Sequence, residues 1–244
     1  MEATISRVRL LYYINVLISV IAVFTLELNF LAIIAVFVLM NWVGVTMTYH
    51  RYWSHRSFEF KNKYLLYISN LFAHLSGSGS AIGWTNIHRQ HHRFSDKEDD
   101  PHQAEKGFLK IMLMRYKMKE GGKYVIDLIR HKYLILMHRN YFAILAMYAV
   151  ILYAINPVLV LELFIIPSAL TMFSEHLTNY VNHRAEANYQ PTNIWWMNFL
   201  SGGDGWHENH HNNPKRYHNS EKWYEIDPTG MFIKYVFGTN LNYT

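Results

Sequence analysis

Long apolar runs constrain this chain most, because each must be buried in lipid or in a protein core. Residues 10–26 and 30–49 carry no charged side chain. A second pair follows at residues 141–155 and 158–174, separated by Asn156-Pro157, with Glu162 near the expected outer end of the last run. The lengths approach the about 17–25 residues that cross a hydrocarbon layer. The pattern predicts four membrane-spanning helices arranged as two hairpins.

The basic residues predict the orientation. No lysine or arginine lies between Arg9 and Arg51 or between Arg139 and Arg184. Because positive loops stay in the cytoplasm, we expect both termini and the segments 50–140 and 175–244 on that side. The net charge of +5 suits an anionic inner leaflet, and basic residues that flank apolar runs argue against nucleic-acid binding.

These features predict one multi-pass domain, residues 1–244, in a bacterial inner membrane or its equivalent. The first run lacks a small-residue cleavage site and another run follows it at once, so it reads as an anchor and not as a signal peptide. The absence of cysteine excludes disulfides, thiolate zinc sites and cysteine nucleophiles.

Three segments between the hairpins have their own signatures. Residues 64–75 are apolar but too short to cross, which indicates an interfacial or re-entrant helix. The small-residue run 76–81 indicates close backbone packing. Residues 103–139 read as surface helices on the membrane, and their basic side chains are Lys110, Arg115, Lys117, Lys119, Lys123 and Arg130.

Histidines are clustered in four short motifs. These are HRYWSH (His50, His55), HRQHH (His88, His91, His92), NYVNH (Asn179, His183) and HENHH (His207, His210, His211). Residues i, i+3 and i+4 share one helix face, so each HxxHH motif directs three imidazoles to one place. Nine imidazoles suit two metal ions with open positions, and imidazole binds iron, copper and zinc.

The spacing of His50 and His55 is different. Five residues correspond to about 140° around an ideal α-helix, which suits two different metals or a helix that ends between them. Chance does not explain the clusters, since an HxxHH motif is expected only about 0.06 times in a chain of this composition. Most of the other histidines are expected to be packing or surface residues, namely His74, His131, His138, His176 and His218; His102, just after the second cluster, is left open.

The ligand type restricts the chemistry. A histidine-only site differs from the Glu-x-x-His pattern of bundle di-iron proteins, and no Ser-His-Asp arrangement, phosphate loop or dinucleotide motif is present. Redox metals beside lipid indicate oxidation of a hydrophobic substrate, because an oxidant made from O₂ can take a hydrogen atom from an unactivated methylene. Two-zinc hydrolysis is an alternative, although it usually uses carboxylate ligands. A metal-storing or metal-transporting protein is a further alternative. It would place polar ligands across the spans, whereas the clustered histidines here lie outside them, which counts against it.

The motifs resemble those of a known family. HRYWSHRSFEF, HRQHHRFSDKEDDPH and GDGWHENHH are similar to the three histidine boxes of membrane fatty-acid desaturases of the Δ9 acyl type. The similarity covers about residues 46–107 and 179–227, including Trp195-Trp196 and WYEID. Lipid hydroxylases and carotenoid oxygenases, the second candidate, generally resemble HxxxH where this chain has HRYWSH.

The resemblance implies an all-α membrane protein of four spans whose cytoplasmic helical cap carries a di-iron site. It assigns His50, His88, His91 and His207 to one iron, with Asn179 through a water. It assigns five histidines to the other, namely His55, His92, His183, His210 and His211. Two electrons and O₂ would remove two hydrogens from the acyl chain and leave a cis double bond and water.

Two further expectations concern partners and substrate. The sequence HPGG of a fused cytochrome b5 is missing, so electrons should come from a separate donor such as ferredoxin or cytochrome b5. Asn86 stands where animal acyl-CoA members resemble an arginine, which favours a lipid-linked chain over acyl-CoA. The acyl tunnel should be lined by residues 64–84 and the spans, with Trp84 and Trp196 as candidate wall residues, although core packing is the better default for any single aromatic side chain.

Overall fold

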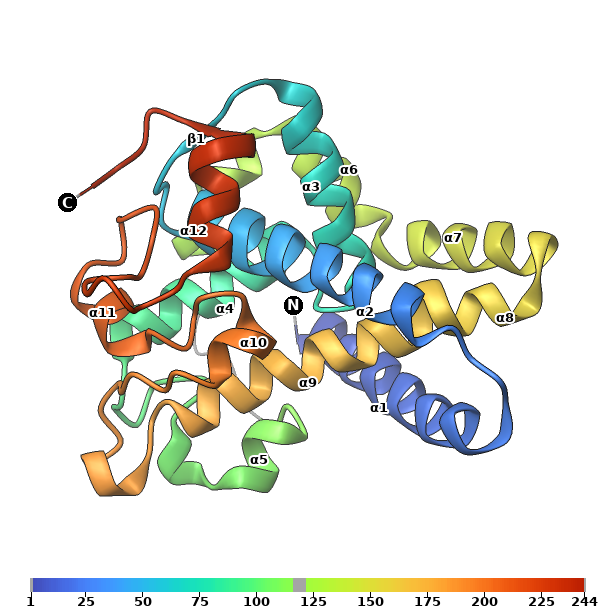
Figure 1. Ribbon diagram of the computed structural model, residues 1–244, viewed down its shortest axis with the longest axis horizontal. Coiled ribbons are helices and arrows are strands. Elements are labelled where there is room, and N and C mark those ends of the chain that lie inside the picture. The colour runs from blue at the N-terminus through green and yellow to red at the C-terminus, as the bar shows by residue number, and fades with distance from the viewer. Residues whose placement is uncertain (1, 116–121, 244) are drawn as a thin grey trace.

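The computed structural model describes residues 2–115 and 122–243 and is largely helical (Figure 1). The first half contains α1 (Glu2–Thr25), α2 (Phe30–Val38), η1 (Leu39–Ser54), β1 (Glu59–Phe60), α3 (Lys63–Leu75), α4 (Ala81–Phe94), η2 (Ala104–Lys106) and α5 (Phe108–Met112). The middle contains η3 (Lys123–Val125), η4 (Leu128–Arg130), α6 (Lys132–Arg139), α7 (Tyr141–Ile155), α8 (Pro157–Val160), η5 (Leu161–Ile165) and α9 (Ile166–Val181). The last part contains η6 (Ala185–Ala187), α10 (Met197–Ser201), α11 (His207–Asn212), α12 (Pro228–Phe232), η7 (Ile233–Phe237) and β2 (Gly238–Thr239).

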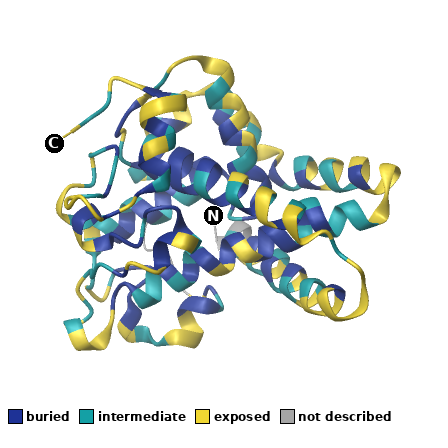
Figure 2. Cartoon of the chain, in the orientation of Figure 1, coloured by how far each residue is buried: buried dark blue, intermediate teal, exposed yellow. Residues whose placement is uncertain are grey.

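Three continuous helices are long and apolar enough to cross a membrane. They are Ile5–Thr25, Phe30–Ser54 and Pro157–Val181, so three of the predicted runs lie in helices of sufficient length. Their outward faces expose large apolar side chains such as Phe24 and Leu31, which are 84% and 81% exposed. Figure 2 shows this exposure concentrated on the protruding ends of the helices. Such surfaces need lipid around them, and the chain is an integral membrane protein.

The predicted third span has a different form. Helix α7 has 15 residues, or about 22 Å, which is less than the about 30 Å of the hydrocarbon core. It reaches spanning length only together with α6, from which it is bent by 68°. The count of four spans therefore stays a prediction.

The spans are joined by polar contacts inside the bundle. Asn15 on α1 donates to Ser168 of α9 at 3.0 Å, and Asn41 on η1 donates to Ser174 of α9 at 3.2 Å. At the far end, the backbone N–H of Asn29 donates to Glu162 at 2.6 Å. Asn29 lies in the turn between the first two spans, so the carboxylate of Glu162 lies near one end of its own span; that this end faces outward stays a prediction.

The second span changes from α-helix to π-helix at Leu39. Hydrogen bonds of the π type join residues five apart, and His55 N–H donates to the carbonyl of His50 at 3.2 Å. The hydroxyls of Thr48 and Ser54 likewise donate five residues back, at 2.8 Å each. Residues five apart therefore share a face of η1, which decides how His50 and His55 are placed.

The segments between the spans pack on this bundle. Helix α3 begins after the N-cap Asn62 and exposes Tyr64 and Ile68, an apolar outer face compatible with the predicted interfacial helix. The close packing predicted for residues 76–81 is confirmed at Gly77, where φ is +84° and a Cβ atom would lie 2.3 Å from the hydroxyl of Ser168. The predicted basic surface segment contains η2, α5, η3, η4 and α6, but its Lys117 and Lys119 lie outside the described residues.

Candidate metal centre

Four separate elements bring the nine histidines together at one end of the bundle. His50 lies in the last part of η1 and His55 directly follows this helix, whereas His183 lies just beyond α9. The two HxxHH motifs lie on α4 and α11, where the i, i+3, i+4 spacing does place three imidazoles on one face. Each of the nine is buried or half-buried.

The nine imidazoles form two groups whose ligand atoms lie within 4.8 Å of one another. The five-histidine group consists of His50, His55, His88, His92 and His210. The four-histidine group consists of His91, His183, His207 and His211. The groups adjoin each other, since the rings of His92 and His211 stack at 4.5 Å with an interplanar angle of 21°.

The family resemblance implies a different division. It is wrong for His50 and His88, which it places with His91, and for His183 and His211, which it places with His55. The α-helical estimate of about 140° between His50 and His55 also fails here. The physical reason is the π-helical turn, in which residues five apart are neighbours, so that both rings reach the same group with centroids 5.0 Å apart. Within HRQHH, His88 and His92 join one group and His91 the other.

The distances between ring nitrogens suit metal binding. The Nε2 atoms of His50 and His210 are 2.9 Å apart, and those of His55 and His88 are also 2.9 Å apart. In the four-histidine group the Nε2 atoms of His183 and His207 are 3.0 Å apart. Two nitrogens bound at about 2.1 Å to one ion at right angles lie about 3.0 Å apart. The donor set therefore fits one ion in each group.

Burial keeps three of the imidazoles in the neutral form that binds metals. Desolvation, followed by the charge of neighbouring histidines, holds the pKa of His55, His88 and His210 well below the ordinary value. Metal binding requires this neutral form. In addition, the Nε2 atom of His91 is buried and has no hydrogen-bond partner among the described residues. A buried lone pair without a partner is costly unless a cation takes it, which supports a metal next to His91.

Carboxylates orient three of the rings from behind. The Nδ1 atoms of His50 and His183 donate to Asp204 at 2.9 Å and to Asp96 at 2.8 Å, and His91 Nδ1 lies 2.9 Å from both oxygens of Asp100. A carboxylate only accepts, so these rings carry their proton on Nδ1 and present the lone pair of Nε2. Burial alone would raise the pKa of Asp100, but His91 and a backbone N–H of residue 102 lower it to about 2.

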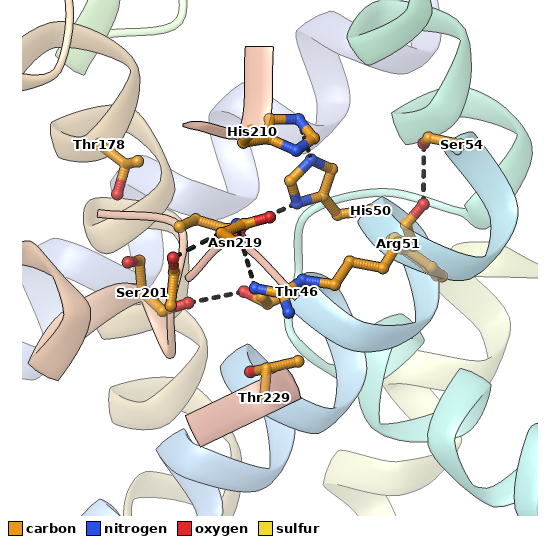
Figure 3. A network of polar contacts seen from close by, with 12 residues as sticks. Thr46, His50, Arg51, Ser54, Thr178, Ser201, His210, Asn219 and Thr229 are labelled. Carbon is orange, nitrogen blue, oxygen red and sulfur yellow. Dashed lines mark hydrogen bonds and ion pairs between the residues drawn. The ribbon is translucent and has the colours of Figure 1, made fainter. Parts of the chain in front are cut away.

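A buried ion-pair network supports the five-histidine group (Figure 3). The guanidinium of Arg51 donates to Asp204 at 3.2 Å and to Asp227 at 2.7 Å, and its side chain is 1% exposed. Asn219 joins both carboxylates: its side chain donates to Asp204 at 3.1 Å and its backbone N–H to Asp227 at 2.7 Å. Arg51 thus fixes the carboxylate that orients His50.

A cavity extends from the metal centre between the spans. His50, His88 and His207 form its wall at the metal end, and Asn179 lies in the same lining. Its apolar part is lined by Ile5, Val8, Val45, Ile87, Met114 and Met172. The empty space, which includes the open solvent at its mouth, amounts to about 1090 Å³. The cavity is therefore a largely apolar approach to the three histidines.

The predicted tunnel residues are only partly in this lining. Trp84 lines the cavity and stacks on His88 at 4.8 Å with an angle of 19°. Trp196 does not line it: it lies at the start of α10 with 40% of its surface exposed, so this expectation is wrong. Of residues 64–84, the small-residue run and the start of α4 contribute, whereas α3 turns its apolar face outward.

The remaining histidines lie outside both groups. His74 is buried against the ring of Tyr141, His131 is exposed, and the ring of His218 contacts that of Tyr217 edge to face with centroids 4.6 Å apart. His138 and His176 line the cavity, as does His102, whose ring centroid is 5.7 Å from that of His91.

Substituting two histidines that lie outside both groups and outside the cavity lining tests the assignment of the nine histidines to the metal centre. His131→Ala and His218→Ala are expected to change metal content and turnover by less than about twofold, since neither ring lines the cavity or joins a group. Iron determination on the purified variants checks this. Loss of metal in both variants would show that His131 and His218 contribute to metal binding.

Several residues that matter at the metal centre had no predicted role. Asp96, Asp100 and Asp204 stand inside or beside the histidine motifs, and an acid that recurs next to metal-binding histidines is the signal that could have found them. Glu175 was also missed, although it is a carboxylate near the end of an apolar helix. It lines the cavity and accepts a hydrogen bond from Trp84 Nε1 at 2.7 Å and another from Ser78.

Comparisons with known proteins agree with this geometry. The family model described as fatty acid desaturase matches residues 28–227. The sn-1 stearoyl-lipid 9-desaturase of Synechocystis sp. is 32% identical over 213 residues, which cover 82% of this chain and 66% of that protein. The sn-2 palmitoyl-lipid 9-desaturase of Nostoc sp. is 30% identical over 81% of this chain and 75% of its own length.

A yeast relative, acyl-CoA desaturase 1 of Saccharomyces cerevisiae, is 28% identical over 85% of this chain but only 44% of its own length. The chain thus spans slightly less than two thirds of the Synechocystis relative and less than half of the yeast one. The residues matched by the family model contain the four histidine motifs and the spans Phe30–Ser54 and Pro157–Val181. The chain belongs to the fatty acid desaturase family.

Proposed function

We propose that this chain is an O₂-dependent di-iron desaturase that introduces a cis double bond, at the Δ9 position, into a saturated and lipid-linked fatty-acyl chain. The observation that carries the proposal is the cavity between apolar spans that ends on His50, His88 and His207. The names of the cyanobacterial relatives, both lipid 9-desaturases, support the lipid-linked substrate and the bond position.

The reaction sets what the protein must supply. Two neighbouring methylenes lose two hydrogen atoms, and O₂ takes them up with two electrons and two protons to give two waters. Two iron ions, held by the nine histidines with Asn179 nearby, would activate O₂ for this step. An external donor such as ferredoxin or cytochrome b5 would supply the electrons.

The residues of the chain bind, orient and exclude water. The apolar lining binds the acyl chain and keeps bulk water from the histidines. Asp204, Asp96 and Asp100 hold three rings in one tautomer. Trp84 stacks on His88 and is itself held by Glu175, so the wall closest to the metal end is rigid.

The path of the chain supports four spans with the histidine cap in the cytoplasm. Helix α4 lies at the metal end, whereas the continuous helix Pro157–Val181 starts at the opposite end, where Glu162 accepts from Asn29, and reaches the metal end only at the last residues of α9. The chain between them must cross the bundle once, and α6 with α7 is the segment available. The absence of basic residues between Arg9 and Arg51 supports a cytoplasmic cap.

Product analysis tests the proposal directly. Cells that express the chain together with ferredoxin or cytochrome b5 are expected to contain new monounsaturated acyl chains, measured by gas chromatography with mass spectrometry against an empty-vector control. Derivatisation of the double bond gives its position. Alcohols in place of alkenes would favour the hydroxylase alternative, and unchanged lipids despite iron-loaded protein would contradict both.

A further inference from the structure

The carboxylates behind the two histidine groups are unequally distributed. In the four-histidine group, two of the four rings are backed by an acid: His183 by Asp96 at 2.8 Å and His91 by Asp100 at 2.9 Å. In the five-histidine group, the only ring so backed among the described residues is His50, by Asp204 at 2.9 Å. The negative charge per ligand is therefore greater around the four-histidine group.

Arginines increase this difference. Asp204 shares the guanidinium of Arg51, so much of its charge is compensated. A second guanidinium, that of Arg89, donates to the carbonyls of Trp53 at 2.7 Å and Ser54 at 3.1 Å, directly before His55. Two guanidiniums thus lie next to the five-histidine group. Each is shared with a further carboxylate, Arg51 with Asp227 at 2.7 Å and Arg89 with Asp127 at 2.8 Å, so together they offset only part of the charge of Asp204.

The acids of the four-histidine group have other partners. Asp100 accepts from the backbone N–H of Asp96 at 3.1 Å and of His102 at 2.8 Å, besides His91. Lys106 is nearby, but its ammonium donates to the main-chain carbonyl of Asp100 at 2.8 Å. Asp96 accepts from the hydroxyl of Ser95 at 2.9 Å, besides His183. Dipoles and not cations therefore hold both carboxylates.

We propose that the two metal sites are electrostatically unequal and that the four-histidine group, through the positioning residues Asp96 and Asp100, holds its ion more tightly. The inference rests on the proposed two-metal function. The fifth imidazole of the other group is a neutral donor, whereas two carboxylates supply negative charge a few ångströms from a dication. A carboxylate behind a histidine also increases the basicity of the ligating nitrogen.

Isosteric substitutions separate charge from shape. Asp100→Asn, Asp96→Asn and the matched control Asp204→Asn remove the charge and keep one oxygen that accepts from Nδ1, so the ring stays oriented. At Asp100 the new NH₂ group faces the backbone N–H of Asp96 or His102, and at Asp204 it faces Arg51 and Asn219, so both variants also lose a hydrogen bond and Asp96→Asn separates charge from shape most cleanly. Asn also tolerates the left-handed backbone of residue 96, where φ is 62°. If one of the four-histidine variants fails to accumulate in the membrane, the other provides the test.

The readout is iron release from the purified, reduced protein to the chelator ferrozine without oxygen. The intact protein is expected to release its two irons in two phases. Asp96→Asn and Asp100→Asn should accelerate the slow phase by about 10–100-fold, whereas Asp204→Asn should accelerate only the fast phase. A single phase, or acceleration of the fast phase by Asp96→Asn or Asp100→Asn, would overturn the inference.

Failure of this inference can be told apart from failure of the proposed function. Single-phase release from a protein that still forms monounsaturated chains would leave the desaturase proposal intact. Two-phase release with the predicted pattern, in a protein whose cells show no new acyl product, would leave the unequal sites and remove the desaturase.

Discussion

His91→Ala and His210→Ala are each expected to abolish formation of unsaturated acyl chains while the protein still inserts into the membrane. His210 Nε2 lies 2.9 Å from that of His50 and 3.0 Å from that of His92, so its loss removes a donor from the centre of the five-histidine group. His91 is 1% exposed, and among the described residues its Nε2 has no hydrogen-bond partner. Neither position touches the apolar faces of the spans.

The measurement is the fatty-acid profile of cells expressing each variant, with iron per protein determined after purification. Each variant should lose at least one of two irons and should fall at least about 1000-fold in turnover, because an open coordination position in the wrong place disables the pair. His131→Ala is the matched control, since it removes an imidazole of the same size from the surface. Retained product in either variant would remove the metal hypothesis.

Arg51→Ala is expected to be the most destabilising single change at the site. It would leave Asp204 and Asp227 buried without their cation, and removing one partner of a buried ion pair costs about 3–5 kcal/mol. Asp204 would also lose its fixed position behind His50. We therefore expect a lower midpoint of thermal unfolding in detergent together with loss of iron from the five-histidine group.

Two further variants test whether the buried ion pairs cause this loss of stability. Arg51→Lys keeps the charge but cannot span both carboxylates with a planar fork, so an intermediate loss is expected. Arg56→Ala is the control: its side chain is 70% exposed and its pair with Asp127 contributes about 0–1 kcal/mol. An unfolding midpoint for Arg51→Ala equal to that of Arg56→Ala would show that the network does not hold the site together.

The sequence predicts the membrane helices and the membership of the histidine cluster for simple reasons. The two runs that contain Phe24 and Leu31 have no charge to keep them in water, and their exposed side chains face outward in the structure. His88, His91 and His92 share one face of any helix that contains them. These are local properties, and local periodicity is visible in a sequence.

The remainder depends on contacts between distant parts of the chain. Asp96 and His183 are 87 positions apart, and Arg51 reaches Asp227 across 176 positions, so neither pair has a spacing that marks it. Trp196 was misplaced because an aromatic side chain suits a cavity wall and a surface equally well. The division of the ligands failed for His50, because the sequence does not show where an α-helix changes into a π-helix.

This change of helix type means that the number of residues between the first two ligands and the winding of the helix depend on each other. Three intervening residues would bring two histidines to one side of an ordinary α-helix, whereas four intervening residues do so only where backbone hydrogen bonds run from residue i to i+5. His50 and His55 follow the second rule. Deleting one residue between them would therefore be tolerated only if η1 rewound at the same time, so motif length and backbone winding are expected to change in a single step.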